Sequence, residues 1–425
     1  MIELSQEEAA ASALLVGLPG SDLSELEGLV STLGMSIARS FLLSRLEPAP
    51  AYGMGRGKAE EIAALAESLA ADVIIFDFEI DPRKQRNWEK LAKRPVFDRQ
   101  EVILRIFAQR ARTKEAVLQV RLAQLEYSLP RLAHMYGDMA RQRGGNYGAK
   151  GSGETQLEMD RRQVRQKIYQ LRGELSQVVR DRAVQRSRRE RVPLPSCALV
   201  GYTNAGKSSL LNALTGSDVF VEDKLFATLD PTTRRLQLQS GSSMLLTDTV
   251  GFISHLPHSL VNAFKSTLEE AARADVLLVV LDSGDAAAEV HYKTVLSVLE
   301  EIGAAGIPRI IVLNKTDRAT DPAGLLQLQR LRALFPDALP VSARTGAGFS
   351  QLVGRISSAL LGDERPYLIP LEQASLLQEL RKKGALRNEA WLEDGIYFLA
   401  RVPAGSRLEA ILAPFSCGLR RPQGI

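Results

Sequence analysis

The stretch Ser196-Cys-Ala-Leu-Val-Gly201-Tyr-Thr-Asn-Ala-Gly206-Lys207-Ser208 decides the fold of the central part of the chain. It begins with a short apolar run typical of a buried strand and continues with the G-x-x-x-x-G-K-S pattern of a phosphate-binding P-loop. The backbone amides of such a loop and the N-terminus of the helix that follows bind the β-phosphate of a nucleotide. Lys207 is expected to neutralise β- and γ-phosphate charge, and the Ser208 hydroxyl to ligate Mg²⁺.

Three further segments follow the P-loop in the order that a guanine nucleotide site requires. Ser243–Thr247 is expected to be a strand ending in Asp248-Thr-Val-Gly251, where the aspartate can hold Mg²⁺ through water and the glycine amide can meet the γ-phosphate. Another apolar run leads into Asn314-Lys315-Thr316-Asp317, whose carboxylate can accept hydrogen bonds from guanine N1 and its exocyclic amine. Adenine lacks this pair of donors, so the motif favours GTP over ATP. Finally, a backbone amide at Ser342-Ala343 can meet guanine O6.

The segment between the P-loop and Asp248 should contain a threonine that reaches Mg²⁺ and senses the γ-phosphate. In Leu225–Thr233 the preferred residue is Thr228, with Thr232 and Thr233 as alternatives, although the segment could also be an ordinary polar loop. The predicted ligands of Mg²⁺ are Ser208, Thr228 and Asp248, the last through water. The residues predicted to bind GTP or GDP are Gly201, Tyr202, Thr203, Asn204, Ala205, Gly206, Lys207, Ser208, Ser209, Phe226, Ala227, Thr228, Asp248, Thr249, Val250, Gly251, Asn314, Lys315, Thr316, Asp317, Ser342, Ala343 and Arg344.

The residue after Gly251 bears on the rate of hydrolysis. In Ras-like proteins a glutamine at this place orients the attacking water, whereas here it is Phe252. A phenyl ring cannot align water, so we expect slow intrinsic hydrolysis that a partner stimulates. Alternatively, Phe252 points away from the phosphates and packs beneath the following helix. The sequence names no catalytic base.

From Ser12 to Asp98, short apolar runs alternate with helical patterns, which predicts a small α/β unit with a mostly parallel sheet. The predicted strands are Ala13–Leu18, Ile37–Leu43, Asp72–Phe78 and Pro95–Phe97. The predicted helices lie near Asp22–Leu33, Ala59–Ala70 and Pro82–Leu91. The glycines at 53, 55 and 57 beside Lys58 favour a sharp turn that contacts RNA, or a plain loop, over a second phosphate loop.

The periodicity changes at Asp98, which has capping-box spacing with Glu101 and predicts the start of a helix. Leucines at 118, 122, 125, 129 and 132 then repeat at heptad spacing, as do the apolar residues at 164, 168, 171, 175 and 178. With the glycine-rich connector of residues 137–153 between them, these runs predict an antiparallel helical hairpin. Each helix should have some thirty residues and a length of about 45 Å. Pro130 is expected to kink the first helix, and Thr155 with Glu158 to cap the second.

The hairpin region is strongly basic. Residues 101–200 hold 20 Lys or Arg against 10 Asp or Glu, whereas the other 325 residues hold 34 against 40. A basic block in an otherwise acidic chain indicates a polyanionic partner such as nucleic acid, although a solvated helix face would have the same composition. The glycine-rich connector is either an RNA-contacting tip or a mobile link. The candidate RNA contacts are Arg180, Arg182, Arg186, Arg188 and Arg189.

Composition excludes several other classes of protein. Hydrophobic residues make up 45% of the chain, but no apolar run approaches the ~20 residues that a membrane-spanning helix needs. No signal peptide is recognised, and the cysteines at 197 and 417 and the four histidines lack metal-ligand spacing. We therefore expect a cytoplasmic monomer of the α/β multidomain class. Its expected parts are an N-terminal α/β subdomain (1–97), a basic helical hairpin (98–192), a Ras-like GTP-binding domain (193–362) and a small C-terminal domain (363–425).

Together these motifs resemble those of HflX-type GTPases, within the OBG/HflX-like P-loop group. The resemblance rests on four segments, namely Tyr52-Gly-Met-Gly55-Arg-Gly57-Lys58, Asp98–Thr113, Gly151–Arg162 and Asp248–Glu270. It implies a GTPase that binds the large ribosomal subunit (50S) and acts in ribosome splitting or rescue under stress. It also implies that the N-terminal subdomain and the hairpin lie against ribosomal RNA.

The chain departs from the family pattern at two places. Lys84 occupies a position where a glutamine is usual, and Ser152 one where a proline is usual. Both positions lie in the regions expected to contact RNA. The alternative is a GTP-gated ribosome assembly factor or molecular switch, and an ATPase is opposed by Asp317.

Overall fold

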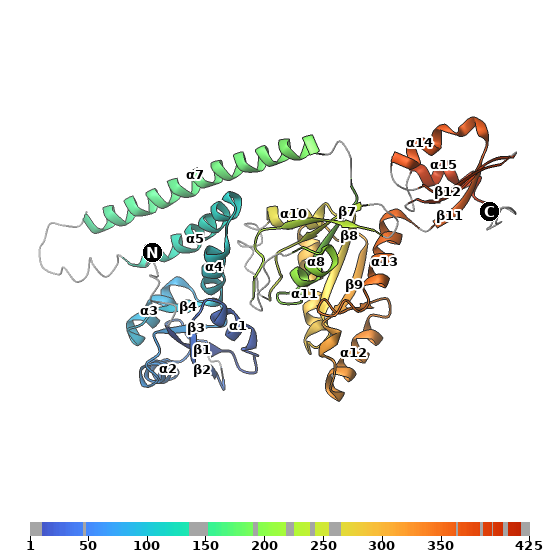
Figure 1. Ribbon diagram of the computed structural model, residues 1–425. Coiled ribbons are helices and arrows are strands. Elements are labelled where there is room, and N and C mark those ends of the chain that lie inside the picture. Colours follow the sequence, from blue (N-terminus) through green and yellow to red (C-terminus); the bar gives the residue numbers. More distant parts are fainter. Residues whose placement is uncertain are drawn as a thin grey trace, which may run out of the picture. The chain divides into compact units, whose positions relative to one another are not determined.

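The computed structural model describes residues 11–45, 48–135, 152–189, 194–217, 225–238, 243–254, 265–362, 364–382, 386–392, 394–402 and 407–417 (Figure 1). The chain forms two compact units. The first unit contains the described residues within 1–191, 222–230 and 255–266, and the second contains those within 192–221, 231–254 and 267–425. The segment 225–230, which follows the P-loop in the sequence, therefore belongs to the first unit.

The first unit is built on a four-stranded parallel sheet with the strand order β2-β1-β3-β4. Its strands are β1 (Ser12–Gly17), β2 (Ser36–Leu42), β3 (Val73–Phe76) and β4 (Val96–Asp98). Its connecting helices are α1 (Ser24–Thr32), α2 (Arg56–Ser68) and α3 (Pro82–Ala92). Phe76 and Trp88 are fully buried in its core, with ring centroids 5.0 Å apart. The predicted α/β unit is confirmed.

The helices described after the sheet are α4 (Arg99–Arg110), α5 (Lys114–Met135) and α7 (Ser152–Arg189). As predicted, Asp98 caps α4 by accepting a hydrogen bond from the Glu101 amide at 2.9 Å. The single helix expected from Asp98 onward is wrong, because the chain breaks between α4 and α5. At this break Thr113 caps α5 by accepting a hydrogen bond from the Ala116 amide at 3.2 Å.

The second helix of the predicted hairpin also begins at a different place. It begins at Ser152 rather than at Thr155. Pro130 lies inside α5, which continues to Met135, so its predicted kink stays a prediction. The connector of residues 137–153 lies outside the described residues apart from its last two.

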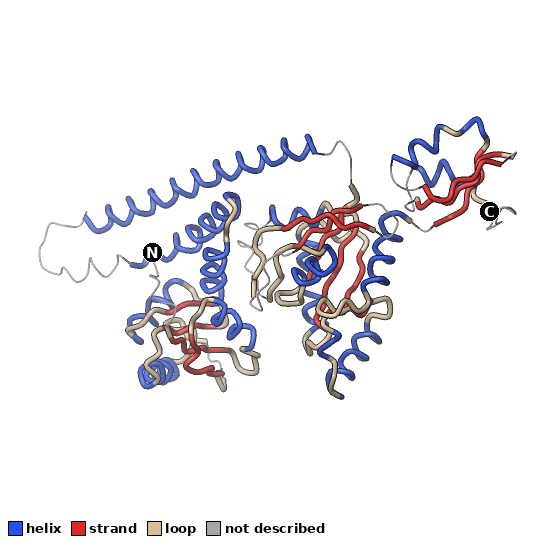
Figure 2. The backbone as a smooth tube through the Cα atoms, viewed as in Figure 1, coloured by secondary structure: helices blue, strands red, loops and turns tan. Residues whose placement is uncertain are grey.

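Helices α5 and α7 run side by side, as the two heptad runs require (Figure 2). Leu118 and Leu122 of α5 pack against Ile168 and Leu171 of α7, and all four side chains are buried. The heptad residues Leu125, Leu129, Val164, Leu175 and Val178 flank this cluster. The predicted pairing of the two apolar faces is present, although α7 has 38 residues and α5 only 22.

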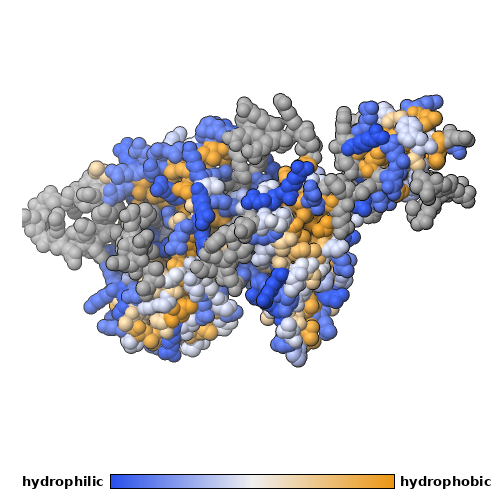
Figure 3. Space-filling view, in the orientation of Figure 1, coloured by the Kyte–Doolittle hydropathy of each residue, from blue (hydrophilic) through white to orange (hydrophobic). Residues whose placement is uncertain are grey.

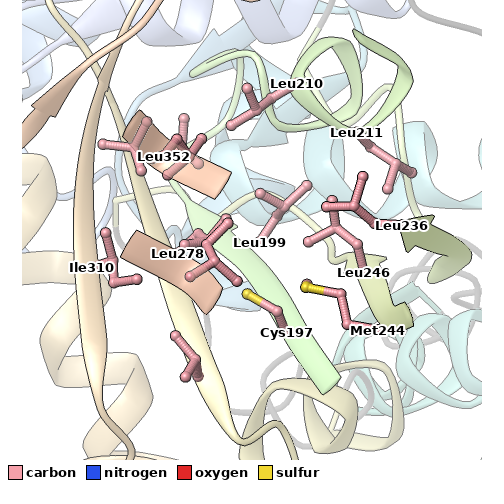
Figure 4. Close-up of a cluster of buried hydrophobic side chains, with 14 of the residues drawn as sticks. Cys197, Leu199, Leu210, Leu211, Leu236, Met244, Leu246, Leu278, Ile310 and Leu352 are labelled. Carbon is pink, nitrogen blue, oxygen red and sulfur yellow. The ribbon is translucent and has the colours of Figure 1, made fainter. Parts of the chain in front are cut away.

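The second unit contains a six-stranded sheet with the order β10-β9-β8-β5-β7-β6, parallel except for the antiparallel pair β6–β7. Its strands are β5 (Ser196–Gly201), β6 (Thr232–Gln237), β7 (Ser243–Asp248), β8 (Val276–Asp282), β9 (Arg309–Asn314) and β10 (Leu339–Pro340). Its helices are α8 (Lys207–Thr215), α10 (Lys265–Ala272), α11 (Ala288–Glu301), α12 (Pro322–Leu334) and α13 (Phe349–Leu361). Figure 4 shows part of the core, in which Leu199 and Leu278 of the central strands are fully buried beside Leu210 of α8.

The last part of the chain forms a three-stranded antiparallel sheet with the order β11-β13-β12. Its elements are β11 (Glu364–Ile369), α14 (Ser375–Lys382), β12 (Leu386–Leu392), β13 (Gly395–Arg401) and α15 (Arg407–Leu412). Ile369, Leu380 and Phe398 are fully buried in a separate core. Short 3₁₀ helices occur at Thr316–Arg318, Leu371–Gln373 and Ala413–Phe415. Within the described part of the chain, none of the helices combines the length and the apolarity that crossing a membrane takes.

Candidate functional site

The P-loop connects the carboxyl end of β5 to the N-terminus of α8, at the centre of the second sheet. Its conformation depends on two glycines with positive φ. A Cβ atom on Gly201 (φ 155°) would lie 2.3 Å from the Val280 carbonyl oxygen. A Cβ atom on Gly206 (φ 88°) would lie 2.3 Å from Asn314 Nδ2. Only glycine fits such close approaches, so the pattern in the sequence reflects the packing of the loop against β8 and β9.

The side chain of Lys207, the first residue of α8, is buried against the P-loop. Its Nζ donates hydrogen bonds to the Tyr202 carbonyl at 2.8 Å and to the Gly201 carbonyl at 3.1 Å. Burial lowers the pKa of Lys207 to about 8, against the attraction of Asp248, which raises it. The ammonium group is thus held where an anionic ligand would favour its charged form.

Two of the predicted magnesium ligands lie together beside Lys207. Ser208 Oγ donates a hydrogen bond of 2.6 Å to Oδ2 of Asp248, which is fully buried at the end of β7. A hydroxyl and a carboxylate provide the oxygen ligands that Mg²⁺ prefers, so the residues fit this ion. The third predicted ligand, Thr228, lies in the segment that belongs to the first unit.

The predicted base-binding residues are also brought together. Asn314 Nδ2 donates to the Ala205 carbonyl at 3.0 Å, while its Oδ1 accepts from the Ala343 amide at 3.0 Å. Asn314 therefore links the P-loop to the Ser342-Ala343 segment. Ser342 Oγ donates to Asp317 Oδ1 at 2.6 Å and so orients the carboxylate expected to meet guanine. Lys315 pairs with Asp282 at 2.9 Å, a partner at the end of β8 that no sequence motif indicated.

The segment after β7 lies directly on the P-loop. The Thr203 amide donates to the Phe252 carbonyl at 2.7 Å, and the Phe252 amide donates to the Gly201 carbonyl at 3.1 Å. The Phe252 ring is only 1% exposed, which agrees with the alternative expectation that it packs away from the phosphates. A Cβ atom on Gly251 would lie 2.8 Å from Thr203 Cα, so glycine is required for this close approach.

The segment 225–230 packs against helices of the first unit. Phe226, which was predicted to contact the nucleotide, is buried against Phe107 of α4 with ring centroids 4.6 Å apart. The Asp230 carboxylate accepts hydrogen bonds from the amides of Arg112 and Thr113 at 3.2 Å and from Thr113 Oγ1 at 2.5 Å. Sequence reasoning missed Asp230, because its partners lie more than a hundred residues away in the chain.

The alternatives to Thr228 lie in the sheet of the second unit. Thr232 and Thr233 both belong to β6, and Thr232 pairs with Asp248 in the antiparallel ladder. Thr233 Oγ1 shares a hydrogen bond of 2.9 Å with Thr247 Oγ1 across the two strands. A role in the sheet accounts for both threonines.

Helix α3 donates hydrogen bonds to the backbone just before the glycine motif of residues 53–57. Asn87 Nδ2 donates to the Ala51 carbonyl at 2.8 Å, and Trp88 Nε1 donates to the Tyr52 carbonyl at 2.9 Å. Gly53 has a φ of 79°, and a Cβ atom there would lie 3.7 Å from Lys84 Cδ, so the departure at position 84 lies beside this turn.

The predicted RNA contacts are described only in part. Arg180 is exposed and donates to Gln177 Oε1 at 2.9 Å, whereas the side chains of the other four arginines lie outside the described residues. His291 stacks on Tyr202 with ring centroids 3.6 Å apart. Among the described residues, no cluster of His, Cys, Asp and Glu could hold a metal ion.

A mainly parallel sheet that presents a P-loop after β5, an aspartate after β7 and an Asn-Lys-x-Asp motif after β9 defines a P-loop guanine nucleotide-binding protein. Three family models match the chain. They are described as "GTP-binding GTPase N-terminal" at residues 20–108, "GTP-binding GTPase Middle Region" at 110–189 and "50S ribosome-binding GTPase" at 196–315. The chain belongs to the GTPase HflX family and is a GTP hydrolase.

Individual relatives span nearly the whole chain. The GTPase HflX of Akkermansia muciniphila is 45% identical over 403 residues, which cover 92% of each chain. That of Escherichia coli is 42% identical over 376 residues, which cover 88% of each chain. A crystal structure of a GTP-binding protein from Sulfolobus solfataricus in complex with GDP is 26% identical, with a TM-score of 0.43, and covers 82% of this chain and 98% of that one.

Proposed function

We propose that this GTPase binds the large ribosomal subunit, that the subunit stimulates its hydrolysis of GTP, and that this activity splits or rescues ribosomes under stress. The protein would act as a monomer in the cytoplasm. Lys207 and the P-loop amides would hold the β- and γ-phosphates, and Asp317 would select guanine. Ser208 and Asp248, with Thr228 from the segment 225–230, would hold Mg²⁺, which when bound neutralises phosphate charge.

The observation that carries the ribosomal part of the proposal is the solvent-exposed face of α7. Arg162, Arg165, Tyr169 and Arg180 are exposed and follow helical spacing on one side of the helix, away from the buried face of Ile168 and Leu171. Hydrophilic residues cover much of the visible surface along this helix (Figure 3). A row of guanidinium groups suits a phosphate backbone, and an aromatic ring among them can stack on an unpaired base. Tyr169 is 82% exposed, so packing among the described residues does not account for it.

The requirement for a stimulating partner follows from Phe252. Its ring is buried and therefore cannot orient the attacking water, as a glutamine at this position does in Ras-like proteins. The ribosome would then either supply the group that orients the attacking water or order the loop of this protein that contains such a group. Turnover by the isolated protein should be slow for this reason.

The test is the turnover of GTP with and without purified 50S subunits, with ATP measured in parallel. We expect a large increase that depends on 50S and is confined to GTP. The variant R162E/R165E should lose most of this increase, while R330E/R332E on the exposed side of α12 is the matched control with the same change in charge and should retain it. An absence of stimulation while GTP still binds would instead favour an assembly factor or switch.

A further inference from the structure

Tyr202, the second residue of the P-loop, contacts the segment after β7 through its hydroxyl group. The hydroxyl accepts a hydrogen bond of 2.6 Å from the Ser254 amide and donates one of 2.7 Å to Ser254 Oγ. Both bonds use the same phenolic oxygen, which can act as donor and acceptor at once. Ser254 is thus held at its backbone and at its side chain by one group.

The ring of Tyr202 is itself fixed from the opposite side by α11. His291 stacks on it with an interplanar angle of 12°, and His291 Nδ1 lies 2.5 Å from Asp285 Oδ2. Asp285 also accepts a hydrogen bond from the Ala287 amide at 2.8 Å. Burial alone would raise the pKa of Asp285, but the hydrogen bonds from His291 and Ala287 lower it, so the carboxylate remains charged and orients the imidazole.

We call Tyr202, Ser254, His291 and Asp285 together the Tyr202 anchor. The anchor holds the segment of residues 251–254, which is expected to contact the γ-phosphate. In the structure, the Phe252 carbonyl accepts a hydrogen bond from the Thr203 amide, and Gly251 lies against Thr203. If the Thr203 amide is to bind a γ-phosphate, the Phe252 carbonyl must leave it, which requires this segment to shift on the P-loop. Such a shift has to break the bonds to the Tyr202 hydroxyl along with the backbone bonds.

We propose that Tyr202 is a positioning residue that holds residues 251–254 in the conformation lacking a γ-phosphate contact, and so sets how strongly the protein prefers GDP to GTP. The Tyr202 hydroxyl shifts the equilibrium between two positions of this segment. The P-loop amides, in contrast, bind the nucleotide in both positions. A group that stabilises one state lowers the apparent affinity of any ligand that needs the other. The inference depends on the proposed nucleotide site.

The variant Tyr202→Phe tests it, because phenylalanine keeps the ring on His291 and removes only the hydroxyl. Affinities for GDP and for a non-hydrolysable GTP analogue are measured by titration with a fluorescent nucleotide. We expect the ratio of GTP-analogue to GDP affinity to rise about three- to tenfold, the size expected for a lost hydrogen bond or two. Ser254→Ala should produce a smaller rise, and the double variant should equal Tyr202→Phe, because both changes remove the same interaction.

Tyr292→Phe is the matched control, since Tyr292 is the neighbour of His291 on α11 and packs its ring on Phe335 at 4.9 Å. It should leave the affinity ratio unchanged. A uniform loss of affinity for both nucleotides in Tyr202→Phe, or an unchanged ratio, would overturn the anchor. If the wild-type protein bound neither nucleotide, the proposed nucleotide site itself would be wrong, which is a separate outcome.

Discussion

Lys207 carries its ammonium group in a place that water hardly reaches, and this has a consequence for pH. Its pKa is lowered to about 8 by burial, whereas in the unfolded chain it returns to its ordinary value of 10.5. Between these two values the unfolded chain binds more protons, so the free energy of unfolding rises with pH across this window. Bound phosphates should raise the pKa of Lys207 again, because they favour the charged form.

We therefore expect that binding of GDP at pH 8.5 takes up a substantial fraction of one proton, while binding at pH 7 takes up far less at this residue. The affinity should fall as the pH rises above 8. Isothermal titration calorimetry in two buffers of different ionisation enthalpy measures the uptake directly. Equal heats in both buffers at pH 8.5 would show that Lys207 is already charged before the nucleotide arrives.

The specificity of the base site is also a property of single residues. Asp317→Asn keeps an oxygen for the Ser342 hydroxyl but loses the charged acceptor for the guanine N1 proton and amine. The affinity for GTP should fall about 10- to 100-fold and the preference over ATP should narrow, as expected for lost hydrogen bonds to a charged group. Competition binding measures both effects. Asp321→Asn, which changes the capping carboxylate of α12, is the control, and an unchanged preference in Asp317→Asn would refute the assignment.

Among the elements, α5 begins after a capping residue, Thr113, that is itself held by Asp230 of the segment 225–230. Asp230→Ala removes the acceptor for the Arg112 and Thr113 amides and the partner of the Thr113 hydroxyl. We expect a loss of about 0.5–2 kcal/mol of local stability, the usual range for a lost cap. Amide exchange over residues 112–117, followed by mass spectrometry, should become faster.

The matched variant Asp321→Ala removes the cap of α12, whose carboxylate accepts from the Gly324 amide at 3.1 Å. It should accelerate exchange in α12 and leave residues 112–117 unchanged. If exchange at residues 112–117 stayed the same in Asp230→Ala, the Asp230 carboxylate would contribute nothing to the local stability of this helix start.

The same helix shows which features of the fold a sequence can predict. The strands of the first sheet were placed within two residues, because a buried strand is a short local run of apolar side chains. The break before α5 was missed, since it depends on Thr113 and on a carboxylate distant in sequence. The P-loop and Asn314–Asp317 were identified from local spacing, whereas Tyr202 stacked on His291 could not be, because only the tertiary fold brings α11 to the P-loop.

At the scale of the whole molecule, the positive charge is concentrated in residues 101–200, about a quarter of the chain. The excess of Arg and Lys in residues 101–200 includes the exposed arginines of α7. The proposed contact with ribosomal RNA should therefore weaken steeply with salt, since each phosphate neutralised releases counterions. Division of the chain into four domains also remains a proposal, because contacts between residues separate it into two compact units.

Cosedimentation with 50S subunits between 50 and 200 mM salt measures this dependence. R162E/R165E should reduce the slope of log affinity against log salt by roughly 1 to 2, as expected for two lost phosphate contacts. R330E/R332E should leave the slope unchanged. A slope near zero in the wild-type protein would mean that contacts other than phosphates hold it to the ribosome.

The contact between Asp230 and Thr113, the capping residue of α5, also affects how the sequence can change in evolution. A substitution that removes this carboxylate leaves the capping residue Thr113 without its partner, and a change at Thr113 removes the hydroxyl that donates to Asp230. The two positions should therefore vary together among relatives, although 117 residues separate them. A nucleotide-binding domain transplanted from a distant homologue would arrive without its counterpart on the hairpin. Recombination within this lineage should consequently preserve the segment 225–230 together with the junction between α4 and α5.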